Sequence, residues 1–223
     1  MAGGWRVLRD CRHNRAVSKV HEAIAAYYSA TLAAHGATAR GADWKDDASH
    51  RVRHDQFLRL LGDDRDASIA DLGCGFGSFL SFLRGRGYRG RYTGYDVAPA
   101  MVAAAERLHG LGADRVWRVA ALPDEEADYV IASGIFNVRQ QCAEEDWREH
   151  VETTISGMAA AARRGWGFNV LSLHSDAGRR RSDLYYADPV KTVEQVAARY
   201  GRSLALLQDY GLYEFTLLVR RAS

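Results

Sequence analysis

Three glycines and an aspartate form the most chemically informative pattern in this chain of 223 residues. The stretch 69–80 reads IADLGCGFGSFL, so a short apolar segment is followed by Gly73, Gly75 and Gly77 and then by a helix start. Glycines at this spacing allow a tight turn and let backbone N–H groups approach a ligand. Asp96 ends the next apolar segment, YTGYD, where a βαβ unit presents a carboxylate to the two hydroxyls of a ribose. The pattern predicts a nucleoside-binding site.

The spacing of the glycines separates this site from the common phosphate-binding loops. A dinucleotide fingerprint places its third glycine three residues after the second, whereas Gly77 follows Gly75 by only two. A P-loop needs Gly-Lys-Ser/Thr, which this turn lacks. Asp71 precedes the first glycine, and its charge would repel a phosphate but suit an ammonium group. We therefore expect a nucleoside that carries an ammonium group.

These motifs resemble those of the class I S-adenosylmethionine (SAM)-dependent methyltransferases, whose first motif reads D-x-G-x-G-x-G and whose second strand ends in an acidic residue. The resemblance covers about residues 50–220 and is most specific in these two motifs. It implies that SAM is the cofactor and that Asp96 binds the ribose hydroxyls. The other cofactor-binding residues that it implies are Arg53, Asp71, Gly73, Gly75, Gly77, Val97, Met101, Ala121, Leu122 and Ser133.

Several of these residues also fit a purely structural role. Asp71 and Asp96 stand where an aspartate can cap the helix that follows. Arg53 resembles a basic residue that meets the SAM carboxylate in some family members, but an exposed helix arginine fits the pattern too. Tyr28 and Trp44 can cover the sulfonium by cation–π attraction or simply hold the N-terminal helices in place. The sequence leaves these alternatives open.

Polar residues after the later strands are candidates for the acceptor site. The segment 133–137 follows the fourth expected strand, and the resemblance places it below the sulfonium. The strings NVLSLHSD (169–176), SDLYYADP (182–189) and DYGLYEFTLLVRR (209–221) look like a little-characterised bacterial branch of the family. His174 has the side chain best suited to proton removal at neutral pH. The candidate catalytic residues are Asn137, His174 and Tyr186, and the candidate substrate-binding residues are Tyr28, Phe136, Asn137, Asp176, Tyr185 and Tyr186. For the aromatic residues among them, core packing is the alternative.

Alternating apolar segments predict an α/β fold. Helices are expected over 17–34 and 49–61 before the first strand, and the last two strands are joined by a turn at Asp209-Tyr210-Gly211 that makes them antiparallel. We expect a Rossmann-like sheet of seven strands, mostly parallel, with an antiparallel C-terminal hairpin. An N-terminal helical cap (1–62) would precede a SAM-binding domain (63–223). The expected strands are 68–72, 91–96, 115–120, 127–133, 166–173, 203–209 and 212–220, and the later helices are 76–86, 98–109, 144–163 and 188–200.

Composition limits the partners and the compartment. The net charge of +2 argues against bulk attraction to nucleic acid, although the run Arg179 to Arg181 is locally basic, either as a solvated loop or as a contact for an anionic group. Cys11, Cys74 and Cys142 are scattered and form no C-x-x-C pair, which predicts a reduced, cytoplasmic protein without structural zinc. No apolar run approaches the ~20 residues of a membrane span, and the N-terminus lacks a signal-peptide core. We expect no membrane segment.

No residue pattern calls for a metal or a covalent nucleophile. His50 and His54 are four residues apart but lack a third ligand nearby, and no G-x-S-x-G motif is present. SAM brings its own leaving group, so the protein need only align a nucleophile and exclude water. The sequence therefore favours methyl transfer to a hydroxyl or amine of a small metabolite or natural-product intermediate.

Two rival hypotheses use the same pocket. A SAM cyclase would convert SAM without an acceptor into azetidine-2-carboxylate and methylthioadenosine. This hypothesis would be favoured by a site that the N-terminal cap closes and in which Asn137 and a tyrosine hold the amino acid moiety. A non-catalytic SAM-binding subunit is the third reading. The sequence does not decide whether the chain forms a homodimer.

Overall fold

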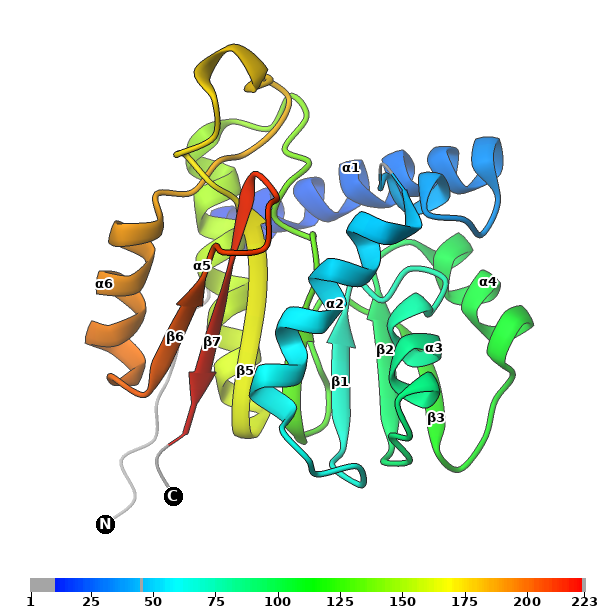
Figure 1. The fold of residues 1–223 in the computed structure, drawn as a ribbon. Coiled ribbons are helices and arrows are strands. Elements are labelled where there is room, and N and C mark those ends of the chain that lie inside the picture. The colour runs from blue at the N-terminus through cyan, green and yellow to red at the C-terminus, as the bar shows by residue number, and fades with distance from the viewer. Residues whose placement is uncertain (1–10, 45, 222–223) are drawn as a thin grey trace.

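Seven strands form one sheet in the computed structural model, which describes residues 11–44 and 46–221 (Figure 1). The predicted absence of a signal peptide concerns residues 1–10, which lie outside the described residues. The strands are β1 (Ile69–Leu72), β2 (Tyr92–Asp96), β3 (Arg115–Val119), β4 (Ala127–Ala132), β5 (Ala162–Leu171), β6 (Leu204–Leu207) and β7 (Glu214–Arg220). The helices are α1 (Cys11–His35), η1 (Arg40–Ala42), α2 (Asp47–Leu61), α3 (Ser78–Gly85), α4 (Pro99–His109), α5 (Glu144–Ala161), η2 (Ala177–Arg179) and α6 (Pro189–Tyr200).

The strand order is β3-β2-β1-β4-β5-β7-β6. The first five strands run parallel to their neighbours, and β7 runs antiparallel to both β5 and β6. Every residue of β1 and β2 is buried, because helices and loops cover the sheet on both faces, as their apolar runs predict. The order reverses between β1 and β4, which is where doubly wound sheets open a crevice at their carboxyl ends. The predicted Rossmann-like fold with an antiparallel C-terminal hairpin is confirmed.

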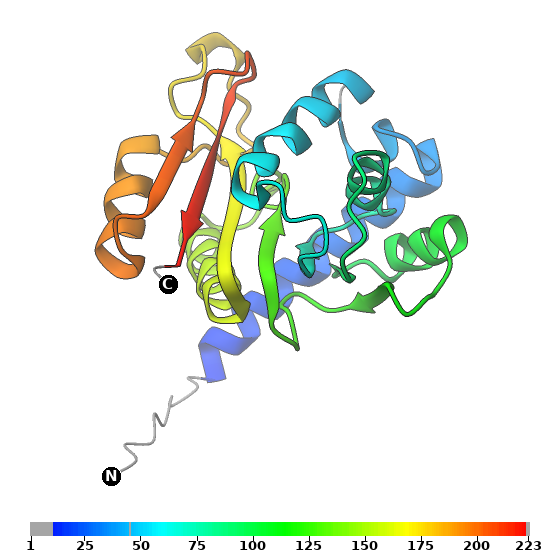
Figure 2. The same cartoon turned by 60° about the horizontal axis from the view of Figure 1, so that its bottom comes forward.

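Two hydrophobic clusters lie on opposite faces of the sheet. On one face, α2, α3 and α4 pack against the strands through residues such as Phe57, Phe79 and Val102. On the other face, α5 and α6 pack through residues such as Met158 and Val196. Figures 1 and 2 show these helices in two layers with the sheet between them. None of the helices in the described part of the chain is long and apolar enough to cross a membrane.

The N-terminal helices have different relations to the sheet. The helix α1 contacts η1, α4 and α5, and it crosses near the carboxyl ends of the strands in Figure 1. The helix α2 packs on β5 and β7 and contributes Phe57, Leu60 and Leu61 to the core. The helix α2 therefore belongs to the main core, whereas α1 and η1 lie over the crevice. The division at residue 62 stays a prediction.

Two predicted boundaries are wrong. The strand expected over 166–173 is β5, which begins at Ala162 directly after α5. Arg163 and Arg164 concealed this start, because they are exposed and pair with Asp128 and Asp64 at the edge of the fold. The hairpin connection is also longer than the predicted tight turn, since β6 ends at Leu207 and β7 begins at Glu214.

Candidate functional site

The carboxyl ends of β1, β2 and β4 open into one pocket, at the point where the strand order reverses. The glycine turn after β1, the residues that follow β2 and the segment 133–135 after β4 form one side of it. Side chains from α1, α2 and α5, with Trp44 between η1 and α2, complete the lining. The pocket therefore joins segments that are far apart in the sequence.

The glycine turn reaches the pocket at Gly75. This residue has a φ of +54°, and no heavy atom lies within 4 Å of the position that a Cβ would take, so a ligand can approach the backbone there. Gly73 also lines the pocket, but a Cβ on it would meet the side chain of Ile135 at 2.1 Å. Gly77 lies outside the lining, and a Cβ there would meet Trp117 at 2.6 Å. The third glycine of the motif is thus explained by packing.

Asp96 lines the pocket and holds two neighbouring backbone segments, although it does not cap α4, whose N-cap is Ala98. One carboxylate oxygen, Oδ2, accepts a hydrogen bond from the Gly75 N–H at 2.9 Å, and Oδ1 accepts one from the Ala98 N–H at 2.8 Å. Burial raises the pKa of this carboxyl to about 6. Each carboxylate oxygen can accept a second hydrogen bond. Asp96 can therefore hold the glycine turn in place and still accept from a ligand hydroxyl.

Asp71 lies at the end of β1 and also lines the pocket. Its side chain is buried, and Oδ2 accepts a hydrogen bond from the hydroxyl of Tyr92. Burial raises the pKa of Asp71 to about 7, and the nearby charge of Asp96 acts in the same direction. A cation in the pocket would favour the ionised form of this carboxyl.

Most of the remaining predicted cofactor residues are also on the lining. Val97, Met101, Ala121 and Ser133 follow the ends of β2, β3 and β4 and face the pocket. Leu122 does not, because its side chain packs against α5, where a Cβ on Gly157 would meet it at 2.7 Å.

Tyr28 reaches the pocket from α1. Burial, with a smaller contribution from Asp43, raises the pKa of its hydroxyl well above the usual range. Tyr28 therefore stays a neutral phenol at physiological pH.

The charge of the lining is one-sided. Among the described residues that line the pocket, the acidic side chains are Asp71 and Asp96, and there is neither a lysine nor an arginine. A phosphate or a carboxylate ligand would lack a fixed positive partner in this lining, whereas a cationic ligand would be stabilised by both carboxylates. The electrostatics agree with the ammonium group that the sequence predicts.

Two stacked rings, Trp44 and His50, form a roof over the residues that follow β4. The Trp44 ring lies so close to Gly134 that a Cβ there would be 2.3 Å from it. The rings of Trp44 and His50 are 5.2 Å apart with an interplanar angle of 27°. Nε2 of His50 lies 3.3 Å from the hydroxyl of Ser78. The roof thus contacts both the glycine-turn side and the β4 side of the pocket.

Arg53 supports the roof from outside the pocket lining. Its guanidinium carbon lies 4.1 Å from the centre of the Trp44 ring, and its Nε donates to Oε2 of Glu214 at 2.8 Å. Nη1 of Arg53 is buried and has no hydrogen-bond partner among the described residues. The predicted contact of Arg53 with the SAM carboxylate stays a prediction.

The string DYGLYEFT contains the residues that hold Arg53. The Tyr210 hydroxyl lies 2.9 Å from the hydroxyl of Thr216 and donates to Oε1 of Glu214 at 3.4 Å. The side chain of Glu214 has no exposed surface, and burial raises its pKa. This network connects the C-terminal hairpin through Arg53 to Trp44.

Sequence reasoning missed Asn169, which shapes the β4 side of the pocket. Asn169 lies in the middle of β5 and has no exposed surface. Its Oδ1 accepts from the Gly134 N–H at 2.6 Å, and its Nδ2 donates to the Ser133 hydroxyl at 3.3 Å. An amide inside an otherwise apolar strand was the available signal, since a buried polar side chain needs hydrogen-bond partners.

Four histidines line the pocket, and the sequence pattern indicates a site role for none of them. His21 comes from α1, His50 and His54 come from α2, and His150 comes from α5. Burial lowers the pKa of each ring, to about 4 for His50 and for His150. Within the described ranges, no group of three or more metal-ligating side chains is positioned to hold a metal ion. These rings are therefore neutral polar groups in the pocket wall.

The candidate acceptor residues after β4 contact other parts of the protein interior and do not face the pocket. Asn137 is buried, and its Oδ1 accepts from the Leu171 N–H at 3.0 Å, which joins the loop after β4 to β5. Phe136 has no exposed surface and packs edge-on against Phe168. Neither residue is on the pocket lining.

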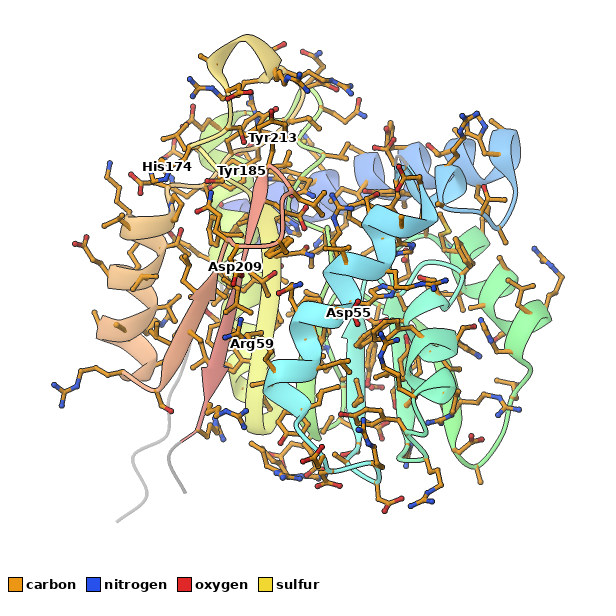
Figure 3. All side chains as sticks on the ribbon, in the orientation of Figure 1. Asp55, Arg59, His174, Tyr185, Asp209 and Tyr213 are labelled. Atoms are coloured by element: carbon orange, nitrogen blue, oxygen red, sulfur yellow. The ribbon has the colours of Figure 1, made fainter. Side chains whose placement is uncertain are left out.

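The later acceptor candidates are also absent from the pocket lining. His174 is exposed, and Figure 3 shows it above α6, far from α3 and α4. Asp176 accepts from the hydroxyl of Tyr213 at 2.6 Å, and the Tyr186 hydroxyl accepts from the Arg181 N–H at 3.0 Å. Tyr185 packs against the hydrophobic cluster beneath α5 and α6. We therefore assign none of these four residues to the pocket.

Comparisons with known proteins agree with this geometry. Residues 70–164 match the family model of a methyltransferase domain. Over 167 residues, which are 74% of this chain and the whole of its relative, the sequence is 50% identical to Rv1506c of Mycobacterium tuberculosis, whose name gives methyltransferase as a provisional assignment. The chain belongs to the class I SAM-dependent methyltransferases. Their cofactor, SAM, is the positively charged nucleoside that the sequence and the lining both indicate.

Solved methyltransferases share the fold at low sequence identity. The 1,6-didemethyltoxoflavin-N1-methyltransferase of Burkholderia thailandensis aligns over 100% of this methyltransferase and 94% of its own chain, with a TM-score of 0.59 and 16% identity. The magnesium protoporphyrin IX methyltransferase of Synechocystis PCC 6803 aligns over 78% and 84%, with a TM-score of 0.58 and 18% identity. These likenesses concern the fold, so the acceptor has to be argued from the pocket itself.

Proposed function

We propose that this methyltransferase transfers a methyl group from SAM to a hydroxyl or amine of a small molecule that enters the pocket beneath the roof. One observation carries the proposal. The pocket combines two buried carboxylates, no lysine or arginine among its described lining residues, and an open backbone position at Gly75. This combination suits a cationic nucleoside, and a second wall of neutral polar side chains is left for an acceptor.

The residues of the chain divide the work by their chemistry. Asp96 has unused lone pairs for the two ribose hydroxyls, and Asp71 offers a carboxylate to the ammonium group. The Trp44 ring fills the space over Gly134 and excludes water from it. When bound, SAM supplies an electrophilic methyl group on a sulfonium. The protein then contributes mainly orientation and exclusion of water.

The first experiment measures binding and product formation with the purified full-length chain. Isothermal titration calorimetry with SAM tests the cofactor site, and mass spectrometry follows S-adenosylhomocysteine after addition of a panel of small phenols, alcohols and amines. We expect S-adenosylhomocysteine only when an acceptor and SAM are both present. Asp96→Ala is the negative control, and Asp209→Ala, which lies in the β6–β7 connection outside the pocket, is its matched counterpart.

The same assay with SAM alone separates the rival hypotheses. Methylthioadenosine with a four-carbon cyclic amino acid would identify a cyclase, and tight SAM binding without turnover across the panel would leave the non-catalytic reading. A site in which Asn137 and a tyrosine hold the amino acid moiety would have favoured the cyclase, but Asn137 is hydrogen-bonded to the Leu171 backbone and lies outside the lining. Methyl transfer is therefore the function that the site supports best.

The cysteines bear on the cellular compartment of the protein. We propose a cytoplasmic location, because Cys74 and Cys142 are free thiols and neither has a disulfide partner within the described residues. Size-exclusion chromatography tests for the homodimer that the sequence left open.

A further inference from the structure

His150 is an unsatisfied polar side chain in the wall of the pocket. The residue is 5% exposed, and both ring nitrogens, Nδ1 and Nε2, are buried without a hydrogen-bond partner among the described residues. A buried ring nitrogen that has no hydrogen-bond partner destabilises the fold. Most buried polar groups in proteins are paired, so an orphaned ring that lines a ligand pocket indicates a partner that arrives with the ligand.

The surroundings of His150 leave the pocket as the source of that partner. Trp147 and Phe136 pack against the ring, with centroid distances of 5.1 Å and 6.2 Å. His21 from α1 meets it edge-on at 5.1 Å, and this is the titratable group that acts on His150 from the facing helix. Thr154, one turn further along α5, is buried and lines the pocket too. The rings around His150 donate and accept nothing toward it.

The position of His150 separates it from the residues suited to the cofactor. Asp71, Gly75 and Asp96 come from the ends of β1 and β2, whereas His150 comes from α5, which follows β4 and packs on the opposite layer. The lone pair of a neutral imidazole is a hydrogen-bond acceptor, so its natural partner is an O–H or N–H group. The nucleophile of a methyl acceptor carries such a group.

Resting on the proposed function, we infer that His150 contacts the acceptor and removes a proton from an aromatic or enolic hydroxyl. The acceptor oxygen gives its proton to one imidazole nitrogen and forms a C–O bond with the methyl carbon. The C–S bond of the sulfonium breaks, and its electron pair stays on sulfur. One positive charge leaves the sulfur and one appears on the imidazole, so the net charge within the pocket is conserved.

The chemistry of the wall selects this class of hydroxyl. A neutral imidazole matches an acidic O–H such as that of a phenol, with a pKa near ~10, better than that of an alkanol. The rings of Tyr28, Trp44 and His21 offer flat surfaces for a planar acceptor. A carboxylate or phosphate on the acceptor would find no lysine or arginine on the described lining.

The test compares His150→Gln and His150→Phe with wild type and with His35→Gln, an exposed histidine at the end of α1. Acceptor probes are phenol, 4-methoxyphenol and 4-nitrophenol, with aniline and benzyl alcohol as non-phenolic partners. We expect turnover of the phenols only, unchanged SAM affinity in all variants, and a fall in kcat of about 100-fold or more for both His150 variants on phenol. The fall should be much smaller on 4-nitrophenol at about pH 8, where this probe is largely ionised and needs no base.

Each outcome decides the inference. An equal fall in kcat on all three phenols in the His150 variants would show that His150 has a structural role, and would overturn the inference. Turnover of aniline or benzyl alcohol without turnover of any phenol would also overturn it, while leaving methyl transfer intact. Failure of the wild type to bind SAM would instead refute the proposed function. His150→Phe should unfold at the same temperature as wild type or higher, because it removes an unpaired polar group.

Discussion

The guanidinium carbon of Arg53 lies over the ring of Trp44, 4.1 Å from its centre, while Nε of Arg53 donates a hydrogen bond to the fully buried carboxylate of Glu214. A side chain of α2 thus links the roof of the pocket to the last strand of the sheet. The ion pair is held between partners that are 11% and 0% exposed, so breaking it would leave a buried charge. The position of Trp44 therefore depends on residues at both ends of the chain.

Replacing either member of this pair should destabilise the protein. We expect Arg53→Met and Glu214→Gln each to lower the free energy of unfolding by about 3–5 kcal/mol, because each leaves an uncompensated or poorly paired polar group. Arg53→Met should also weaken SAM binding, since Trp44 loses its support. Urea unfolding and calorimetry measure the two effects.

The double variant is the control for this pair. Arg53→Met with Glu214→Gln removes both charges and should be less destabilised than the sum of the single variants. Additive losses would mean that the two side chains are not energetically coupled.

Gly134 is expected to tolerate no side chain. Gly134→Ala would place a Cβ 2.3 Å from the Trp44 ring at a φ of +79°, so the roof must move and the backbone is strained by about 1–3 kcal/mol. We expect a SAM affinity at least about 10-fold weaker, measured by calorimetry. Gly178→Ala, in the exposed helix η2 with open space around the new Cβ, is the matched control. Adding Trp44→Ala to Gly134→Ala should relieve the clash between the new Cβ and the Trp44 ring but not the backbone strain. An unchanged SAM affinity in Gly134→Ala would contradict the close contact between Gly134 and Trp44.

Asp96→Ala should weaken SAM binding by about 100-fold or more, because it removes contacts to the ribose together with two hydrogen bonds that hold Gly75 and Ala98. Thermal unfolding with and without SAM separates the two losses. The variant should be less stable without ligand and should gain little on addition of SAM. A normal ligand-induced shift in Tm would exclude Asp96 from the cofactor site.

SAM affinity should rise with pH up to about pH 7. In the free protein, burial raises the pKa of Asp71 to about 7 and that of Asp96 to about 6, so both carboxyls are partly protonated at pH 6. Binding a cation favours the ionised forms, and these protons must be released at low pH. Calorimetry in buffers of different ionisation enthalpy measures the released protons. Asp71→Asn should flatten this dependence, and a flat profile in the wild type would contradict the assignment.

Substitution of the acceptor candidates that lie outside the pocket should leave catalysis unchanged and affect at most the stability of the protein. His174→Ala leaves an exposed position and should keep wild-type kcat and Tm. Asn137→Ala should lower the free energy of unfolding by about 1–3 kcal/mol, because the Leu171 N–H loses its partner. Circular dichroism and the methyl-transfer assay measure both. A large loss of activity in His174→Ala would return that residue to the site.

Local patterns were enough to predict the fold and one side of the pocket. The glycine turn, Asp71 and Asp96 come from one βαβ unit, in which sequence spacing sets spatial distance. Tyr28 of α1 is a sequence-predicted residue that lines the pocket, but the contact of α1 with α5 could not be predicted in this way, because the helical pattern gives no reason why His21 and His150 should meet. His174 illustrates the converse error, since a favourable side chain after a strand end lies outside the pocket lining.

The sequence alone does not explain the role of the string DYGLYEFT. Its residues Tyr210, Glu214 and Thr216 act through Arg53, and no spacing rule connects positions 53 and 214. Asn169 is a similar case, because its partners Ser133 and Gly134 lie on the neighbouring strand end. Contacts between distant segments depend on the tertiary fold, which local periodicity does not encode.

The link between Trp44, Arg53 and Glu214 has a consequence for how such an enzyme can change its substrate over time. The region that matches the methyltransferase domain, 70–164, contains the glycine turn and His150 but neither the roof nor the residues that hold it. Mutations near Trp44 and Arg53 or in β7 can therefore reshape the roof of the pocket while the cofactor motif stays unchanged. Divergence at the two ends of the chain is a route to new acceptors at constant cofactor chemistry.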